Sequence, residues 1–220
     1  MDYKLDMSSM LAIHQALRRD LDRLGRIAAR PDGNPARLLQ AAAGWKQFKT
    51  FLVAHHTAED QALWPPLREA VAANPDQVAL ADALEEEHSV IEPLLAAIDA
   101  AAADPDDGQQ AIGGIIDELI GKLSGHLRHE ETEGFALIDA TLAPEQWQHF
   151  AAVNAEMVRP DAPNYMPWML SEADQQTLDA VLGKFPPQLL TAYRERWAPA
   201  YAALDIWPAV SAGAGPAGNR

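Results

Sequence analysis

The chain contains no cysteine, which excludes a disulfide framework, a thiolate zinc site and a thiol nucleophile. It also has no run of about 18 apolar residues, so the sequence predicts no membrane-spanning helix. The N-terminal segment MDYKLDMSSM carries charges and lacks the apolar stretch of a secretory signal peptide. From these absences we expect a cytoplasmic protein.

Positive charge is scarce. The 17 Lys and Arg residues face 32 Asp and Glu residues, which gives a formal net charge of −15. Nucleic acids and anionic membranes carry charge of the same sign, so we expect neither of them as a partner. Apolar residues nevertheless make up 48% of the 220 residues, and this share predicts a folded globular protein.

β-Branched runs are few, and the first 143 residues are rich in Ala, Leu, Glu and Gln. Clusters of Pro, Gly and Asp that are typical of helix ends occur at 30–35, 73–76 and 104–108. Between them the apolar residues follow helical spacing, which predicts helices at about 7–29, 36–72, 76–103 and 108–141. Pro65 and Pro66 should kink or interrupt the second. Four helices joined by short loops predict an all-α fold, an antiparallel up-down-up-down four-helix bundle over residues 7–143.

The rest of the chain differs in character, being rich in tryptophan and containing the run RPDAPNYMPW. Helical spacing recurs in segments near 144–157, 171–183 and 186–204. We therefore expect residues 144–206 to form a helical extension packed on the bundle. The Gly- and Ala-rich end, 207–220, is predicted to be a disordered tail.

A weak internal repeat relates the two halves of the predicted bundle. HHTAEDQALWPPL (55–67) aligns with HLRHEETEGFALI (126–138), so that His55 matches His126 and Glu59 matches Glu130. In the first and third predicted helices His14 matches His88, in line with apolar neighbours. The order along the chain is therefore H, H-x-x-x-E, H, H-x-x-x-E, with one element on each helix.

These residues are expected to meet in the core. Residues i and i+4 of a helix share a face, so each H-x-x-x-E points a nitrogen and a carboxylate the same way. Counting residues from the turns places all six groups at similar depth in the bundle. A single buried histidine is more often a hydrogen-bonded core residue than a ligand. Four histidines and two glutamates together would leave buried charges unpaired, at several kcal/mol each, unless they bind metal.

The ligand types narrow the choice of metal. Imidazole and carboxylate without thiolate suit iron, manganese or zinc. Six or seven ligands are too many for one ion, so we expect two ions bridged by Glu59 and Glu130, with histidines as terminal ligands. This ligand set favours a pair of non-haem iron ions, joined by an oxo or hydroxo bridge.

The sequence resembles the hemerythrin-like (HHE cation-binding) family. The residues that carry the resemblance are His14, His55, Glu59, His88, His126 and Glu130. AEDQALWPPL and HEETEGFALI are also similar to the EE-x-x-L-F-P consensus of that family. The resemblance covers about residues 7–141. The extension resembles, more weakly, the C-terminal part of some bacterial, especially actinobacterial, members. The resemblance implies that the protein handles oxygen, nitric oxide or peroxide.

One position departs from the oxygen-carrying members, which have an H-x-x-x-H pair on the third helix. Here His88 is followed four residues later by Glu92, so the second ion needs another ligand. We expect His56 to supply it, because one residue along a helix turns the side chain about 100° from His55 toward the neighbouring ion. Glu92 and His129 are the alternatives, and His149 is expected at the surface.

The expected function is therefore a non-haem di-iron protein that binds oxygen or a related small molecule. An enzyme is the first alternative, for peroxide disproportionation or nitric oxide reduction at the same centre. An iron or redox sensor is the second, although the sequence contains no signalling module. Ferritin-like chemistry is disfavoured, because its E-x-x-H motif occurs on two helices and here fits only Glu85 and His88, with Leu123 at the other position.

Overall fold

The computed structural model describes residues 3–29, 34–104 and 108–208, and these residues form helices and no strand. The bundle region contains α1 (Ser8–Ala28), α2 (Pro35–Ala41), α3 (Ala43–Ala62), α4 (Trp64–Val71), α5 (Pro75–Ala103), α6 (Gly108–His129), the π-helical turn η1 (Glu130–Gly134) and α7 (Phe135–Thr141). The extension contains α8 (Pro144–Val158), the 3-10 turn η2 (Arg159–Asp161), α9 (Ala162–Leu170), α10 (Gln175–Leu182), α11 (Pro187–Ala192), the π-helical turn η3 (Tyr193–Trp197) and α12 (Ala198–Ala202).

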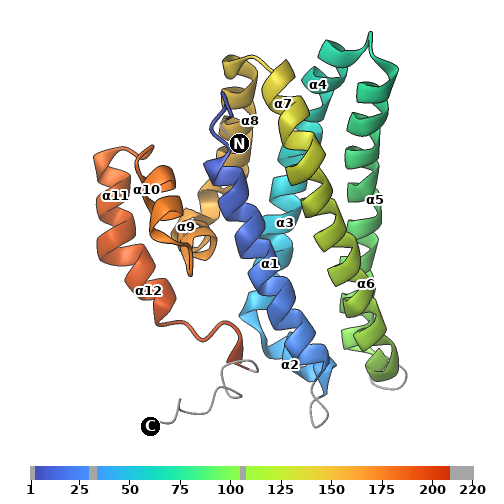
Figure 1. Cartoon of the computed structure of the whole chain (residues 1–220). Helices are drawn as coiled ribbons and strands as arrows, with labels where there is room; N and C mark the ends of the chain where they lie inside the picture. Colours follow the sequence, from blue (N-terminus) through green and yellow to red (C-terminus); the bar gives the residue numbers. More distant parts are fainter. Residues whose placement is uncertain (1–2, 30–33, 105–107, 209–220) are drawn as a thin grey trace, which may run out of the picture.

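Four long rods form the bundle in Figure 1, and in chain order they are α1, α3 continued by α4, α5, and α6 continued by α7. Successive rods run in opposite directions, and α6 packs against both α1 and α5. The predicted all-α, antiparallel four-helix bundle is therefore confirmed.

The predicted turn at 73–76 contains the N-terminal cap of α5. The Asn74 side chain accepts a hydrogen bond from the backbone N–H of Gln77 at 3.3 Å, and Pro75 occupies the first helical position of α5. Asn34 caps α2 in the same way. The other two predicted turns extend into residues 30–33 and 105–107, which lie outside the described part of the chain.

The single helix predicted over 36–72 is wrong, because the chain breaks at two places. Leu63 separates α3 from α4, as Pro65 and Pro66 led us to expect. The break at Ala42 was not predicted. There the backbone is extended, and two residues further on the N–H of Gly44 donates to the carbonyl of Ile206 at 2.8 Å.

The neighbouring residue Trp207, the first residue of the predicted disordered tail 207–220, is also packed against the start of α3. Trp207 is only 3% exposed and lies against Gly44, where a Cβ atom would come within 2.2 Å of the indole ring. The end of the extension thus holds the start of α3, and α3 carries three of the predicted ligands. The remaining tail residues, 209–220, lie outside the described residues.

The extension also contains a helix that the sequence analysis missed. No helix was predicted over RPDAPNYMPW, which contains Pro163 and Pro167, yet α9 spans most of this run. Pro163 sits in the first turn, where no intrahelical N–H is needed. Six consecutive residues, Tyr165–Leu170, are buried, so tertiary packing outweighs the low helix propensity.

A buried carboxylate anchors α9 to α1. Trp168 Nε1 donates to Asp20 Oδ2 at 2.7 Å, and both side chains are fully buried. Arg19 donates to the carbonyl oxygens of Trp168 and Ser171, at 2.9 and 2.6 Å. Arg23 also bonds Asp20, at 2.8 Å, so the buried charge is paired.

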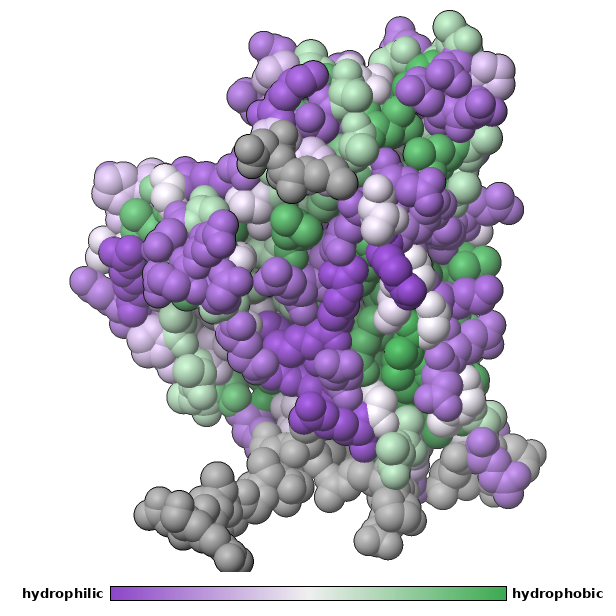
Figure 2. Space-filling model, in the orientation of Figure 1, coloured by the Kyte–Doolittle hydropathy of each residue, from purple (hydrophilic) through white to green (hydrophobic). Residues whose placement is uncertain are grey.

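Two apolar clusters fill the interior, and the predicted ligands lie between them. One cluster joins the half of the bundle near α2 to the extension, and the other fills the half near α4 and α7. The face drawn in Figure 2 is largely hydrophilic, with apolar residues visible between the rods. Among the described residues, no helix combines the length and apolar character needed to cross a bilayer.

Candidate metal centre

All seven predicted metal-binding side chains come together in the middle of the bundle. Each is at most 5% exposed. They come from all four rods: His14 from α1, His55, His56 and Glu59 from α3, His88 from α5, His126 from α6 and Glu130 from η1.

The seven residues form two sets of donor atoms. Group A consists of His14, His55, Glu59 and Glu130, and group B consists of His56, Glu59, His88 and His126. Within each group the candidate ligand atoms lie within 4.8 Å of one another, close enough to surround one cation. Glu59 belongs to both groups, whereas Glu130, which was also expected to bridge the two ions, belongs to group A alone.

The carboxylate of Glu59 faces both groups at once. Its Oε1 lies 3.2 Å from His55 Nε2 in group A, and its Oε2 lies 3.5 Å from His88 Nε2 in group B. Within group A the Nε2 atoms of His14 and His55 are 3.2 Å apart. Within group B those of His88 and His126 are 3.1 Å apart. The imidazoles therefore turn the same nitrogen toward a common point in each group.

Glu130 occupies the π-helical turn that continues α6. Its Oε2 lies 3.3 Å from His14 Nε2, within group A. A π-turn holds one residue more than an α-turn, and such turns often occur at functional sites. The sequence analysis treated 108–141 as one regular helix, because nothing in EETEG distinguishes a π-turn from an α-turn.

Five of the donor atoms are buried without a hydrogen-bond partner, and these atoms test whether a metal fits the site. Both oxygens of Glu59 and both of Glu130 are buried without a hydrogen bond. The same holds for His56 Nε2. Such atoms cost several kcal/mol each in an apolar interior unless something compensates them. Cations held by both groups would satisfy all five atoms, so the residues present fit a two-metal centre.

The pKa values of these groups show the electrostatic cost of burying them close together. Burial raises the pKa of Glu59 well above its usual value, and the charges of Glu130 and Asp60 add to this effect. Burial and the neighbouring imidazoles lower the pKa of His55 and of His56 well below the usual range. These two imidazoles are therefore neutral, which is the form that binds metal.

An outer set of carboxylates orients the histidines. Asp60 Oδ1 lies 2.8 Å from His88 Nδ1, and Glu131 Oε1 lies 2.8 Å from His14 Nδ1. These bonds fix the ring orientation and direct Nε2 toward the centre. Asp60 and Glu131 each follow a bridging-candidate glutamate and match each other in the repeat. The sequence analysis aligned them without assigning this role, although the repeat was the signal that could have revealed it.

Glu131 is itself held by Arg18. The guanidinium donates two hydrogen bonds to it, at 2.7 and 2.9 Å. Burial opposes ionisation of Glu131, but the bonds from His14 and Arg18 outweigh this and lower its pKa to about 2. Glu131 is thus a carboxylate at neutral pH and keeps His14 in place.

The pseudo-symmetry of the outer set fails at one position. Glu87 Oε2 lies 2.9 Å from His126 Nδ1, and Glu87 Oε1 lies 2.8 Å from His129 Nδ1. The residue that matches Glu87 in the repeat is Ile13, which cannot accept a hydrogen bond. Consistently, His55 Nδ1 is buried without a partner. The two groups therefore differ in the charge that supports their histidines.

The structure also distinguishes between His56, Glu92 and His129, the three candidates for the additional ligand of the second ion. The His56 ring stacks on that of His88, with centroids 3.9 Å apart and planes 3° apart, and it belongs to group B. Glu92 is exposed and belongs to neither group. His129 bonds Glu87 and lies in the outer set. His149 is exposed on α8, where it was expected.

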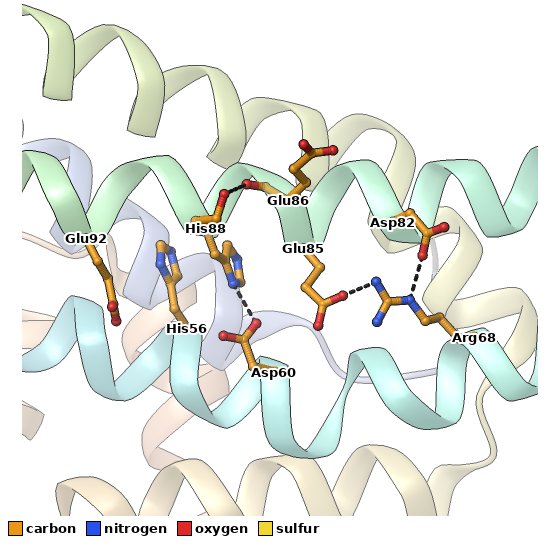
Figure 3. A pocket seen from close by; sticks show the side chains of 9 residues that line it. His56, Asp60, Arg68, Asp82, Glu85, Glu86, His88 and Glu92 are labelled. Carbon is orange, nitrogen blue, oxygen red and sulfur yellow. Dashed lines mark hydrogen bonds and ion pairs between the residues drawn. The ribbon is translucent and has the colours of Figure 1, made fainter.

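A cleft of about 430 Å³ opens beside group B, between α3 and α4 on one side and α5 on the other. His56 and His88, which are 2% and 5% exposed, are buried members of its lining, and Figure 3 shows them side by side between α3 and α5. Its lining includes five carboxylates, those of Asp60, Asp82, Glu85, Glu86 and Glu92. Arg68 is the only cation among the lining residues, and it pairs with Asp82 and Glu85.

Comparison with known families gives an independent result. Residues 7–138 match the family model of the hemerythrin HHE cation binding domain. No curated protein and no solved structure gives a significant match. The matched segment spans the bundle from α1 into α7 and includes all seven clustered residues.

Proposed function

Because the chain belongs to the hemerythrin HHE cation-binding family, we propose that it holds two non-haem iron ions and binds oxygen or a related small molecule, such as peroxide or nitric oxide. His14, His55, Glu59 and Glu130 would hold one ion. His56, His88 and His126, with Glu59 shared, would hold the other. Iron, when bound, supplies a coordination position at which such a small molecule can bind.

The observation that carries this proposal is the position of Glu59 between the two groups. Its two oxygens face a histidine of group A and a histidine of group B. A carboxylate that serves two ions at once favours a coupled pair over two independent ions. Four donors per ion are fewer than the six that iron accepts in many octahedral sites, which supports a site open to a further ligand.

The surrounding residues contribute orientation and dryness. Asp60, Glu87 and Glu131 fix the rings of His88, His126 and His14. The apolar clusters on either side exclude water from the layer of donors. An enclosed, low-dielectric site strengthens the hold on the cations and slows loss of a bound molecule.

Metal analysis combined with absorption spectroscopy tests the proposal. Protein loaded with iron under anaerobic conditions should contain about two ions per chain, in line with the two donor groups. Its spectrum should change when oxygen, peroxide or nitric oxide is added. One ion or fewer per folded chain, or a spectrum that none of the three molecules alters, would contradict the proposal.

One observation favours an enzymatic variant of this function. Glu87 links His126 to His129, whose side chain is 26% exposed, so a hydrogen-bonded chain runs from group B to solvent. Reduction of two nitric oxide molecules to nitrous oxide and water takes two protons and two electrons. Such a chain can deliver the protons, and the assay must contain an added reductant that supplies the electrons. Multiple turnovers of nitric oxide or peroxide by iron-loaded protein would support an enzyme, whereas stoichiometric binding without turnover supports a carrier or sensor.

A further inference from the structure

The acidic cleft beside group B connects exposed carboxylates with two buried histidines of the proposed metal centre. Its carboxylates come from α3 and α5, and its buried lining includes two of the proposed ligands, His56 and His88. We propose that this cleft is the route by which divalent cations enter the centre, with His56 as the first inner ligand they meet. The inference rests on the proposed function, because a route for cations has no purpose without a cation site.

Charge supports a cation over a neutral or anionic molecule. The lining has five carboxylates against one guanidinium. Arg68 engages Asp82 and Glu85 at one end of the cleft. Glu86 and Glu92 have no such partner for their carboxylates among the described residues, and Figure 3 shows Glu92 reaching from α5 toward α3 beside His56. A cleft of one sign with low-dielectric walls raises the local concentration of ions of the opposite sign.

A second observation, independent of the acidic residues, points to the same ligand. His56 lines the cleft, is 2% exposed, and its Nε2 is buried without a hydrogen-bond partner. Behind it lies Glu59, whose oxygens are likewise unpartnered. The cleft therefore leads from exposed carboxylates to a free imidazole nitrogen and then to the shared carboxylate.

The position of the cleft implies an order of filling. It borders His56 and His88 of group B, while no residue that belongs to group A alone lines it. A cation arriving through it reaches group B first. Transfer to group A then proceeds through Glu59, the residue common to both groups.

Uptake kinetics test the route, with cobalt(II) alone as the probe, because its visible absorption reports binding without a redox step. Metal-free full-length protein and a Glu86→Gln/Glu92→Gln variant are mixed with cobalt(II) in a stopped-flow instrument. The matched control is Asp117→Asn/Glu118→Gln, which removes the same charge from exposed residues of α6 outside the cleft. Circular dichroism verifies that all three proteins are folded.

We expect the cleft variant to take up cobalt about fivefold more slowly than wild type at low ionic strength, because part of the steering field is lost. Its final cobalt content should equal that of wild type. The difference should shrink at about 0.5 M salt, where exposed charges are screened. The control should stay within about twofold of wild type, since it changes only the net charge.

Three results would overturn the route: an unchanged rate in the cleft variant, an equal slowing in the control, or a lower final cobalt content in the cleft variant. The last would mean that Glu86 or Glu92 is a ligand and not a guide. Wild-type protein that binds no cobalt and no iron would instead overturn the proposed function, and the route with it. A wild type that loads normally while the cleft variant is unaffected would overturn the route alone.

Discussion

Glu59 is the residue on which the two halves of the centre depend. Its carboxylate lies between His55 and His88, at 3.2 and 3.5 Å, and neither oxygen has a hydrogen bond. A terminal histidine such as His14 serves one group only, and water can replace it. Losing the shared carboxylate removes a negative charge from both ions at once. The attraction between this charge and the ions is strong because the buried site has a low dielectric constant.

We therefore predict that Glu59→Ala abolishes binding of the ion pair, while His14→Ala retains at least one ion. Metal analysis after loading and desalting measures both, and His149→Ala on the exposed face of α8 is the control for removing an imidazole. A Glu59→Ala protein that still carries two irons with a coupled, oxo-bridged spectrum would contradict this assignment.

The second ion is predicted to depend on His56 and not on Glu92. His56 stacks on His88 within group B, whereas Glu92 is exposed at the mouth of the cleft. His56→Ala should lose the ion of group B, and Glu92→Ala should load fully, given time. If His56→Ala keeps two ions and an unchanged spectrum while Glu92→Ala loses one, the roles are reversed.

Metal binding should compete with protons at two ligands. Burial and neighbouring carboxylates raise the pKa of Glu59, and Glu130 and Glu131 raise that of His14 despite its burial. A raised pKa means that the proton is held more tightly, so a cation must displace it. Apparent affinity should therefore fall as the pH is lowered, and binding should release protons.

Calorimetric titrations with cobalt(II) in buffers of different ionisation enthalpy measure the number of protons released. His149→Ala is again the control, because its ring is exposed and outside the centre. An affinity that is constant between about pH 8 and about pH 6, where histidines titrate, would disprove the competition.

Among the helices, η1 has the most direct effect on the centre. Its five residues carry Glu130 and Glu131, which face group A and the Nδ1 atom of His14. The turn ends at Gly134, where an added Cβ would lie 3.0 Å from Leu84 Cδ1 and 3.2 Å from Glu130 Cγ. A side chain at this position would therefore press on the stem of a proposed ligand.

We predict that Gly134→Ala weakens metal binding and destabilises the protein by about 1 kcal/mol, because overpacking outweighs the gain in helix propensity. The matched control is Gly121→Ala in α6, where an added Cβ meets nothing within 4 Å. That variant should gain up to about 1 kcal/mol in unfolding free energy. Chemical denaturation and metal titration measure both effects. Similar behaviour of the two variants would contradict a packing role for Gly134.

In the whole molecule, the layer of buried donors interrupts an otherwise apolar interior. Seven ionisable side chains lie between the two apolar clusters, and the extension packs on both clusters, with Trp147 and Phe150 of α8 in the cluster near α4 and α7. Without cations this layer holds unpaired polar atoms, so it opposes folding. A cation bound only by the folded chain shifts the equilibrium toward the native state.

At a free metal concentration far above Kd, binding to the folded chain adds roughly 4 kcal/mol to the free energy of unfolding. We therefore predict that metal removal lowers the melting temperature by about 10 °C. Scanning calorimetry of metal-free and iron-loaded protein measures the difference. Glu59→Ala provides the control, because it should melt at the same temperature with and without iron. Equal melting temperatures for the two forms of the wild type would place the cations outside the core.

The sequence by itself determined which residues could meet. Helical spacing and the distances from the turns predicted the four rods, and the i, i+4 pairs predicted that His55, Glu59, His126 and Glu130 share one level with His14 and His88. These features are local or follow from regular geometry. For that reason the bundle and the convergence of these six side chains were predictable before any contact was known.

Only the tertiary structure decided how the site is completed. The π-turn at Glu130, the break at Ala42 and the helix α9 depend on contacts between segments far apart in the chain, and such contacts outweigh local propensity. The roles of His56 and Glu92 differ for the same reason. Both lie within one helical turn of a proposed ligand, but the packing of α3 against α5 stacks one on His88 and leaves the other at the mouth of the cleft.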